Sequence, residues 1–115
     1  MTTPELVTAA RDIASLDDAD LLTRFADDVL QEQHLRPPST AQLRVRFGEW
    51  IEQHRSAICG SNRVRQAIED NADEHYLAAA VADALGGSGF VTAGVMATRL
   101  GIARLCAGEW ATEDS

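Results

Sequence analysis

Three histidines, His34, His54 and His75, are the side chains in this chain best suited to bind a metal ion or transfer a proton. They lie about twenty residues apart, and none has a second ligand three or four residues along the chain, as zinc and di-iron sites on helices require. His54 lies in the middle of an apolar stripe, which is typical of a hydrogen-bonded core histidine. The sequence therefore predicts no bound metal and no cofactor.

The glycine-rich stretch GGSGF, residues 86–90, has the serine and the first glycine of a nucleophile elbow. Phe90 replaces the closing glycine of that motif, so Ser88 is a poor nucleophile. The glycine spacing of a phosphate-binding loop also occurs here, but Val95 stands where that loop needs lysine. The acidic stretch 69–75 lacks the alternating ligands and the glycine of a calcium loop. We therefore expect no catalytic residue and no small-molecule substrate, and we predict that the chain is not an enzyme.

Two cysteines, Cys59 and Cys106, follow the apolar residues Ile58 and Leu105. Cysteines in such surroundings are more typical of buried thiols than of a disulfide framework. The sequence therefore predicts that both are reduced. Residues 1–18 show neither the basic lead nor the apolar core of a signal peptide, and together these features predict a cytoplasmic location.

Charge is unevenly distributed along the chain. The net charge is −8, which argues against general binding of nucleic acid. Residues 1–33 contain eight acidic residues and two arginines, a net charge of −6, and residues 67–115 have the same balance. Residues 34–66 instead contain six arginines and two glutamates, a net charge of +4. This acidic–basic–acidic order favours association with another protein, or with a second copy, through charge complementarity.

Five arginines are candidate contacts for a protein partner or for nucleic acid: Arg44, Arg55, Arg63, Arg65 and Arg104. Arg44 and Arg55 flank the same side of one expected helix, about three turns or ~16 Å apart. Glu52 lies three residues before Arg55, so part of this charge is neutralised locally. We rank three interpretations of these arginines. The one we favour most is that they are solvated or paired within the chain; contact with a protein partner is second, and contact with phosphates is third.

Apolar residues recur at helical spacing almost throughout, which predicts an all-α fold, a compact bundle or orthogonal array of about six short helices. We expect a single domain over residues 1–110 and a frayed acidic tail at 111–115. The helices are expected over 4–14, from the SLDDAD turn to the HLRPPST break, from Ser39 to Gly60, from Ser61 or Asn62, from Asp73 to the GGSG stretch, and over 91–107.

The third expected helix has the clearest pattern. Its apolar stripe steps by four, four, three and four residues through Leu43, Phe47, Ile51, His54 and Ile58. Ser39 and Gln42 predict a capping box at its start, and Gly60 is placed to end it. The other expected core residues are Leu21, Leu22, Phe25 and Val29, then Val64 and Ile68, then Tyr76, Leu77, Ala80, Val81, Ala84 and Leu85.

The least polar stretch, FVTAGVMATRLGIARLCAGEW at residues 90–110, has two interpretations. Residues 93–110 resemble the helix-turn-helix motif of DNA-binding proteins over some eighteen residues. The small, apolar and turn positions of that motif are occupied by Met96, Ala97, Leu100, Gly101 and Ile102. The second half departs from the motif, because a recognition helix needs polar side chains facing base edges and this half offers Arg104 and Glu109.

The alternative for the same stretch is one packing helix over 91–107. Ala93, Ala97, Gly101 and Gly108 would share one small face of that helix, with Gly94 close by, and such a face lets a neighbouring helix approach closely. The alanine-rich helix before it is a suitable neighbour. We favour this interpretation. Because Arg99 and Arg104 interrupt the apolar stretch, we expect no membrane span.

Taken together, these features predict a small non-enzymatic helical module for protein–protein interaction: an adaptor, an oligomerising unit or a subunit of a larger assembly. The alternative is a nucleic-acid-binding protein that acts through residues 93–110 or through the arginines of the middle segment.

Overall fold

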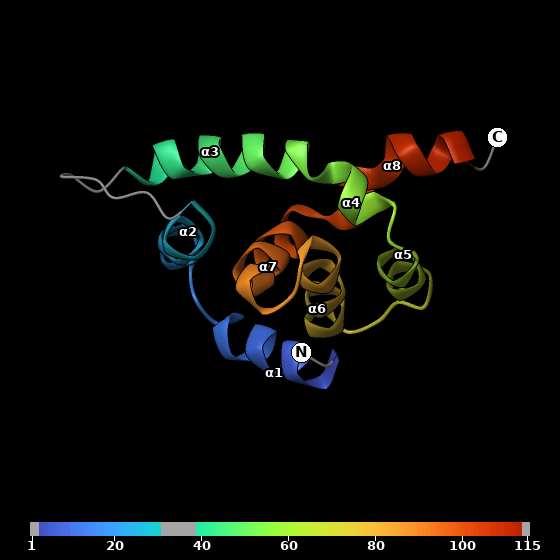
Figure 1. The fold of residues 1–115 in the computed structure, drawn as a ribbon, viewed down its shortest axis with the longest axis horizontal. Helices are drawn as coiled ribbons and strands as arrows, with labels where there is room; N and C mark the ends of the chain where they lie inside the picture. The colour runs from blue at the N-terminus through green and yellow to red at the C-terminus, as the bar shows by residue number, and fades with distance from the viewer. Residues whose placement is uncertain (1–2, 31–38, 114–115) are drawn as a thin grey trace.

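Two consecutive helices, α6 (Glu74–Leu85) and α7 (Val91–Leu100), form the centre of the molecule (Figure 1). This computed structural model describes residues 3–30 and 39–113. Five consecutive residues of α6, Ala78 to Ala82, and seven of α7, Val91 to Ala97, are buried. A helix that is buried on all sides must be apolar on all sides, which explains why this pair has the least polar sequence in the chain.

Gly94 sets the distance between the two central helices. A methyl group at this position would collide with the carbonyl oxygen of Ala78 and lie 3.3 Å from the backbone nitrogen of Ala82. The backbones of α6 and α7 are therefore nearly in contact at Gly94. The predicted close packing of this small-residue stretch against the alanine-rich helix is confirmed at Gly94, whereas Gly101 and Gly108 of the predicted face lie outside α7.

The other helices surround this pair. α1 (Thr3–Ile13) packs on both central helices on one side, and α3 (Thr40–Gln53), α4 (Arg55–Cys59) and α8 (Ile102–Glu113) lie on the opposite side (Figure 1). α2 (Asp18–Phe25), which continues as a π-helical turn over Ala26–Leu30, packs beside α7, and α5 (Asn62–Glu69) packs beside α6. The all-α fold is confirmed, with eight α-helices in the described residues rather than about six.

Polar side chains cap the N-termini of four of these helices. Asp17, Ser39, Ser61 and Asp73 each accept a hydrogen bond from a backbone N–H in the first turn of α2, α3, α5 and α6, and the predicted Ser39–Gln42 capping box is confirmed. The hydrogen bond from the backbone N–H of His75 holds the pKa of the Asp73 carboxyl below its ordinary value. The HLRPPST break falls at 34–40 and lies mostly outside the described residues.

The expected third helix is divided into two. α3 ends at Gln53, and His54, with φ −105° and ψ 5°, separates it from α4. The Nδ1 atom of His54 lies 2.8 Å from the carbonyl oxygen of Trp50, to which the backbone N–H of His54 also donates. The prediction of one continuous helix was wrong because the apolar spacing continues across the bend. The predicted hydrogen bond of His54 is confirmed, but the residue is half-buried rather than in the core, and its ring stacks on Trp50 with the ring centres 4.2 Å apart.

The expected last helix is also divided. Gly101 has a φ of +103° and a ψ of 100°, a conformation that glycine adopts far more readily than other residues. α7 ends before it and α8 begins after it, so the prediction of a single helix over 91–107 was wrong. α8 extends to Glu113, three residues into the segment expected to be a tail. Tyr76 was predicted in the core but is 38% exposed.

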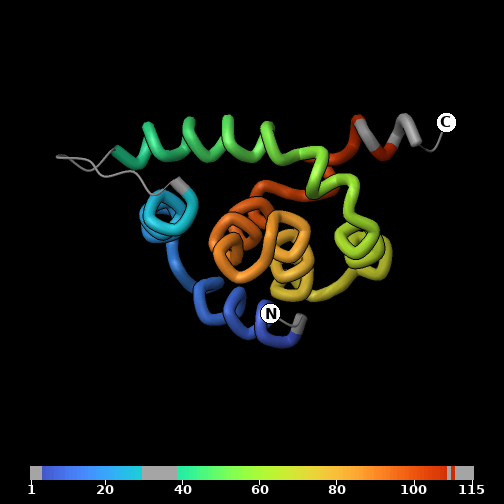
Figure 2. The backbone as a smooth tube through the Cα atoms, viewed as in Figure 1, coloured from blue at the N-terminus to red at the C-terminus, as the bar shows by residue number. Residues whose placement is uncertain are grey.

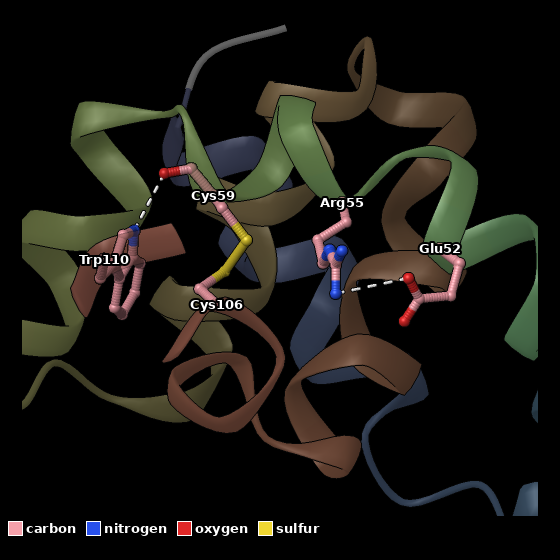
Figure 3. Close-up of a disulfide and its surroundings, with 5 residues drawn as sticks. All are labelled: Glu52, Arg55, Cys59, Cys106 and Trp110. Atoms are coloured by element: carbon pink, nitrogen blue, oxygen red, sulfur yellow. Dashed lines mark hydrogen bonds and ion pairs between the residues drawn. A yellow bond between two sulfur atoms is a disulfide. The ribbon is translucent and has the colours of Figure 1, made fainter. Parts of the chain in front are cut away.

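A disulfide joins Cys59 at the end of α4 to Cys106 in α8 (Figure 3). The prediction of two reduced thiols was therefore wrong. The bend at His54 directs α4 toward the centre, and the turn at Gly101 brings α8 back to meet it. The indole N–H of Trp110 also donates to the carbonyl oxygen of Cys59 at 3.0 Å (Figure 3). Both contacts hold α8 against α4.

Arg99, near the end of α7, binds the segment that connects α1 and α2. Its guanidinium donates to the carbonyl oxygens of Ala14 at 2.6 Å and Leu16 at 2.7 Å, and to the Asp18 carboxylate at 3.1 Å. The two carbonyl oxygens lie in the turn between α1 and α2, and Asp18 is the first residue of α2. Figure 2 shows this turn running from α1 to α2 along one side of the central pair.

We expect Arg99→Met to lower the free energy of unfolding by about 1–3 kcal/mol, the range for hydrogen bonds to a charged group. Arg104→Met is the control, because Arg104 is exposed and makes no hydrogen bond or ion pair with the described residues. The control should change the free energy by no more than about 0.5 kcal/mol. Urea unfolding measures both. Equal stability of the two variants would contradict the fastening role of Arg99.

By length and hydropathy, no described helix could cross a membrane alone. α6 and residues 88–100 pass that test only as a pair, and they are bent by 119° where they meet.

Candidate protein-binding groove

A groove of about 280 Å³ opens at the surface where α2, α3 and α7 meet. Each helix contributes residues three or four positions apart, which share one helix face. The lining residues are Asp18 and Leu22 from α2, Arg44, Phe47 and Gly48 from α3, and Met96, Arg99 and Leu100 from α7. We call this feature the α2–α3–α7 groove.

The groove has an apolar floor and an exposed apolar rim. Leu22, Phe47 and Met96 are buried against the core and form the floor. Leu100 is 56% exposed, although it is a large apolar residue at the end of a core helix. A Cβ atom built on Gly48 would meet no atom within 4 Å. Space above Gly48 is therefore open to a group from outside the chain.

A second hollow of about 260 Å³ shares Leu100 with the groove. It is lined by Leu100, Gly101, Arg104 and Leu105, at the turn between α7 and α8. The exposed Leu100 side chain therefore lies between two depressions. The apolar surface continues from α3, past the end of α7, to the first turn of α8.

Two arginines border this apolar surface without a partner in the described part of the chain. Arg44 lines the groove and Arg104 lines the second hollow, and neither makes a hydrogen bond or ion pair there. Asp18, the acidic residue in the groove lining, is bound to Arg99. The charge available at this surface is therefore positive.

The other three arginines proposed from the sequence lie against acidic or aromatic groups of the same chain. Arg55 is 3.5 Å from Glu52 (Figure 3). Arg63 is 3.2 Å from Asp83 of α6. Arg65 is 3.5 Å from Glu69, and its guanidinium lies 5.8 Å from the centre of the Trp110 ring. The structure thus divides the predicted arginine cluster, and only Arg44 and Arg104 belong to the apolar surface.

The break at Gly101 agrees with the helix-turn-helix interpretation, but the described side chains of α8 offer few polar groups to contact base edges. The break is one residue long, shorter than the turn of about three or four residues in that motif. Where side chains of α8 are described, at residues 102–108 and 110, Arg104 is the one charged residue. The disulfide also fixes α8 to α4.

The remaining histidines do not assemble a reactive group among the described residues. His75 Nδ1 lies 2.9 Å from the Asp73 carboxylate, beside a hollow of about 60 Å³. The hydroxyl in the lining of that hollow, Thr98, donates to the carbonyl of Gly94. No group of three or more potential metal ligands is found in the part of the chain that is described, and His34 lies outside that part.

Sequence reasoning identified Arg44 and Arg104 but not the apolar residues beside them. Leu22 and Phe47 were expected to be ordinary core residues, and nothing in the sequence indicated that Gly48 lines a groove. Leu100 was noted as one position of a motif. Its exposure could not be read from the sequence, because the apolar spacing does not show that α7 ends at this residue. Comparisons with protein-family models, curated proteins and solved structures found no match.

Proposed function

We propose that this chain is a non-enzymatic module for protein–protein interaction that binds its partner through the α2–α3–α7 groove. The exposed Leu100 beside an apolar groove is the observation that carries the proposal. Apolar patches exposed on a soluble domain, especially with a polar rim, mark sites of interaction. The module serves as an adaptor, an oligomerising unit or a subunit of a larger assembly.

The dimensions of the groove support a protein partner over a small molecule. Small-molecule sites usually enclose about 300–1,000 Å³ and cover most of their ligand. This groove, of about 280 Å³, instead lies open at the surface and continues into a second hollow around Leu100. Such a surface accommodates a few side chains from a larger molecule.

The charges support a protein partner over nucleic acid. Phosphate binding needs several arginines gathered in one patch, whereas Arg55, Arg63 and Arg65 lie against acidic groups of their own chain. The groove combines one arginine without a described partner with apolar side chains, a pairing that suits a protein surface.

The disulfide bears on the location. Disulfides persist in oxidising compartments and are rare in the cytosol. The Cys59–Cys106 bond therefore favours an oxidising compartment over the cytoplasm expected from reduced cysteines.

Site-specific photo-cross-linking tests the proposal. Benzoylphenylalanine in place of Gly48 would project from the groove, and the same residue in place of Gly108 is the control, since neither position has an atom within 4 Å of a Cβ. We expect protein adducts from Gly48, in cells that produce the chain, at several times the yield from Gly108. Equal yields or no adducts would contradict the proposal, and nuclease-sensitive adducts would support nucleic-acid binding instead.

A further inference from the structure

We infer that the occupant of the α2–α3–α7 groove is an amphipathic helix of another protein, with an apolar stripe flanked by acidic residues. This inference rests on the proposed function, and it adds the chemistry of the partner. Three features carry it: the helical walls of the groove, the exposed Leu100, and the arginines that line the groove and the second hollow, Arg44 and Arg104.

The helical walls of the groove favour an occupant that is itself helical. Helices satisfy their own backbone hydrogen bonds, so walls made of α2, α3 and α7 offer side chains but few backbone groups. The described residues include no strand whose edge could pair with an extended segment. An occupant that loses water here must satisfy its own backbone groups. An α-helix does so, and docking of an amphipathic helix in an apolar groove is a common mode of recognition.

The floor and rim determine the apolar face of that helix. Leu22, Phe47 and Met96 lie at the bottom of the groove, and Leu100 stands beside it. Gly48 leaves room at the middle of the α3 wall. Apolar side chains of the occupant, spaced three or four residues apart, would fit over the floor and against Leu100.

The arginines at this surface favour acidic residues beside the apolar stripe of the occupant. Arg44 and Arg104 border the apolar surface, and neither has a hydrogen-bond or ion-pair partner in the described residues. The nearby acid, Asp18, is already bound by Arg99 at 3.1 Å. Carboxylates on the occupant would pair with these two arginines and set its orientation.

Two synthetic helical peptides test this inference. They share one leucine stripe at positions i, i+3, i+4 and i+7 and differ in the flanking residues, glutamate in one and lysine in the other. We expect the glutamate peptide to bind the full chain about tenfold more tightly than the lysine peptide in fluorescence anisotropy at low salt. The difference should shrink as salt is added.

Matched variants assign the binding to the groove. Arg44→Glu with Arg104→Glu should reverse the preference, whereas Arg55→Glu with Arg63→Glu, which changes the net charge equally, should leave it in place. Gly48→Leu should reduce glutamate-peptide binding at least about tenfold by filling the groove, and Gly108→Leu should not. Circular dichroism confirms that each variant is folded.

Three results would overturn the inference. Equal affinity for the two peptides would show that the partner is not chosen by acidic residues. No binding of either peptide would show that the groove does not accept a helix. Self-association that Gly48→Leu abolishes would identify a second copy as the occupant. Cross-links from Gly48 alongside equal peptide affinities would leave the proposed function in place, so the two failures are distinguishable.

Discussion

Replacing Cys59 and Cys106 together by alanine should lower the free energy of unfolding by about 4 kcal/mol. The disulfide closes a loop between residues 47 positions apart, and the loss of chain entropy in the unfolded state that such a loop imposes corresponds to about this energy. Small domains are stable by only about 5–15 kcal/mol. The disulfide therefore accounts for a large fraction of the stability.

The loss should be greatest in α8. This helix is held to α4 by the disulfide and by the hydrogen bond from Trp110 to the Cys59 carbonyl. Without the disulfide, the amides of residues 102–108 should exchange faster than those of the central helix α7, because local opening of α8 no longer breaks a covalent link. Hydrogen exchange measured by mass spectrometry or NMR resolves the two helices.

The wild-type chain treated with a reductant is the control for this variant. It should show a similar or slightly smaller loss of stability in urea unfolding, since reduction removes the same constraint but keeps both buried sulfur atoms. Titration of thiols in the unfolded, unreduced chain should find none. Two free thiols per chain in that titration would show that the cysteines are reduced, as the sequence predicts, and would contradict the disulfide.

Gly94→Ala should lower the free energy of unfolding by about 3 kcal/mol. Alanine is normally the better helix residue by about 1 kcal/mol, so helix propensity alone predicts a gain. The new methyl group, however, would collide with the carbonyl oxygen of Ala78. Overpacking typically costs about 1–3 kcal/mol, and here the obstacle is backbone, which cannot rotate away. We expect the upper end of that range, because α6 and α7 must separate.

Gly108→Ala is the matched control for Gly94→Ala. Gly108 also lies within a helix, but a methyl group there would meet no atom within 4 Å. This variant should therefore gain up to about 1 kcal/mol. Urea unfolding followed by circular dichroism measures both. A gain at both glycines would show that α6 and α7 are not in close contact at Gly94.

The Gly94 and disulfide variants test different parts of the fold. Gly94 lies between the two central helices, whereas Cys59 and Cys106 join two helices on one side of them (Figure 1). Since the sites share no partner in the contacts described, their effects should add within about 0.5 kcal/mol. The groove is a third region, and Gly48→Leu is expected to change binding rather than stability.

Local chemistry determined most of the helices from the sequence. Ser39 and Gln42 are three residues apart, and the side-chain oxygen of each accepts a hydrogen bond from the backbone N–H of the other, so the start of α3 needs no distant contact. The apolar residues of α2 and the alanines of α6 likewise follow from helical spacing. The close approach of α7 to α6 was predictable too, because small residues along a helix allow a neighbouring helix to approach closely.

Tertiary structure decided where helices bend and which side chains meet. The stripe of α3 and α4 continues through His54, because a bend changes the direction of a helix without changing the spacing of its apolar residues. The pairing of Cys59 with Cys106, the attachment of Arg63 to Asp83 and the exposure of Leu100 all depend on the packing of separate helices. The groove brings together residues 18 to 100 from three helices, a juxtaposition that only long-range packing can create.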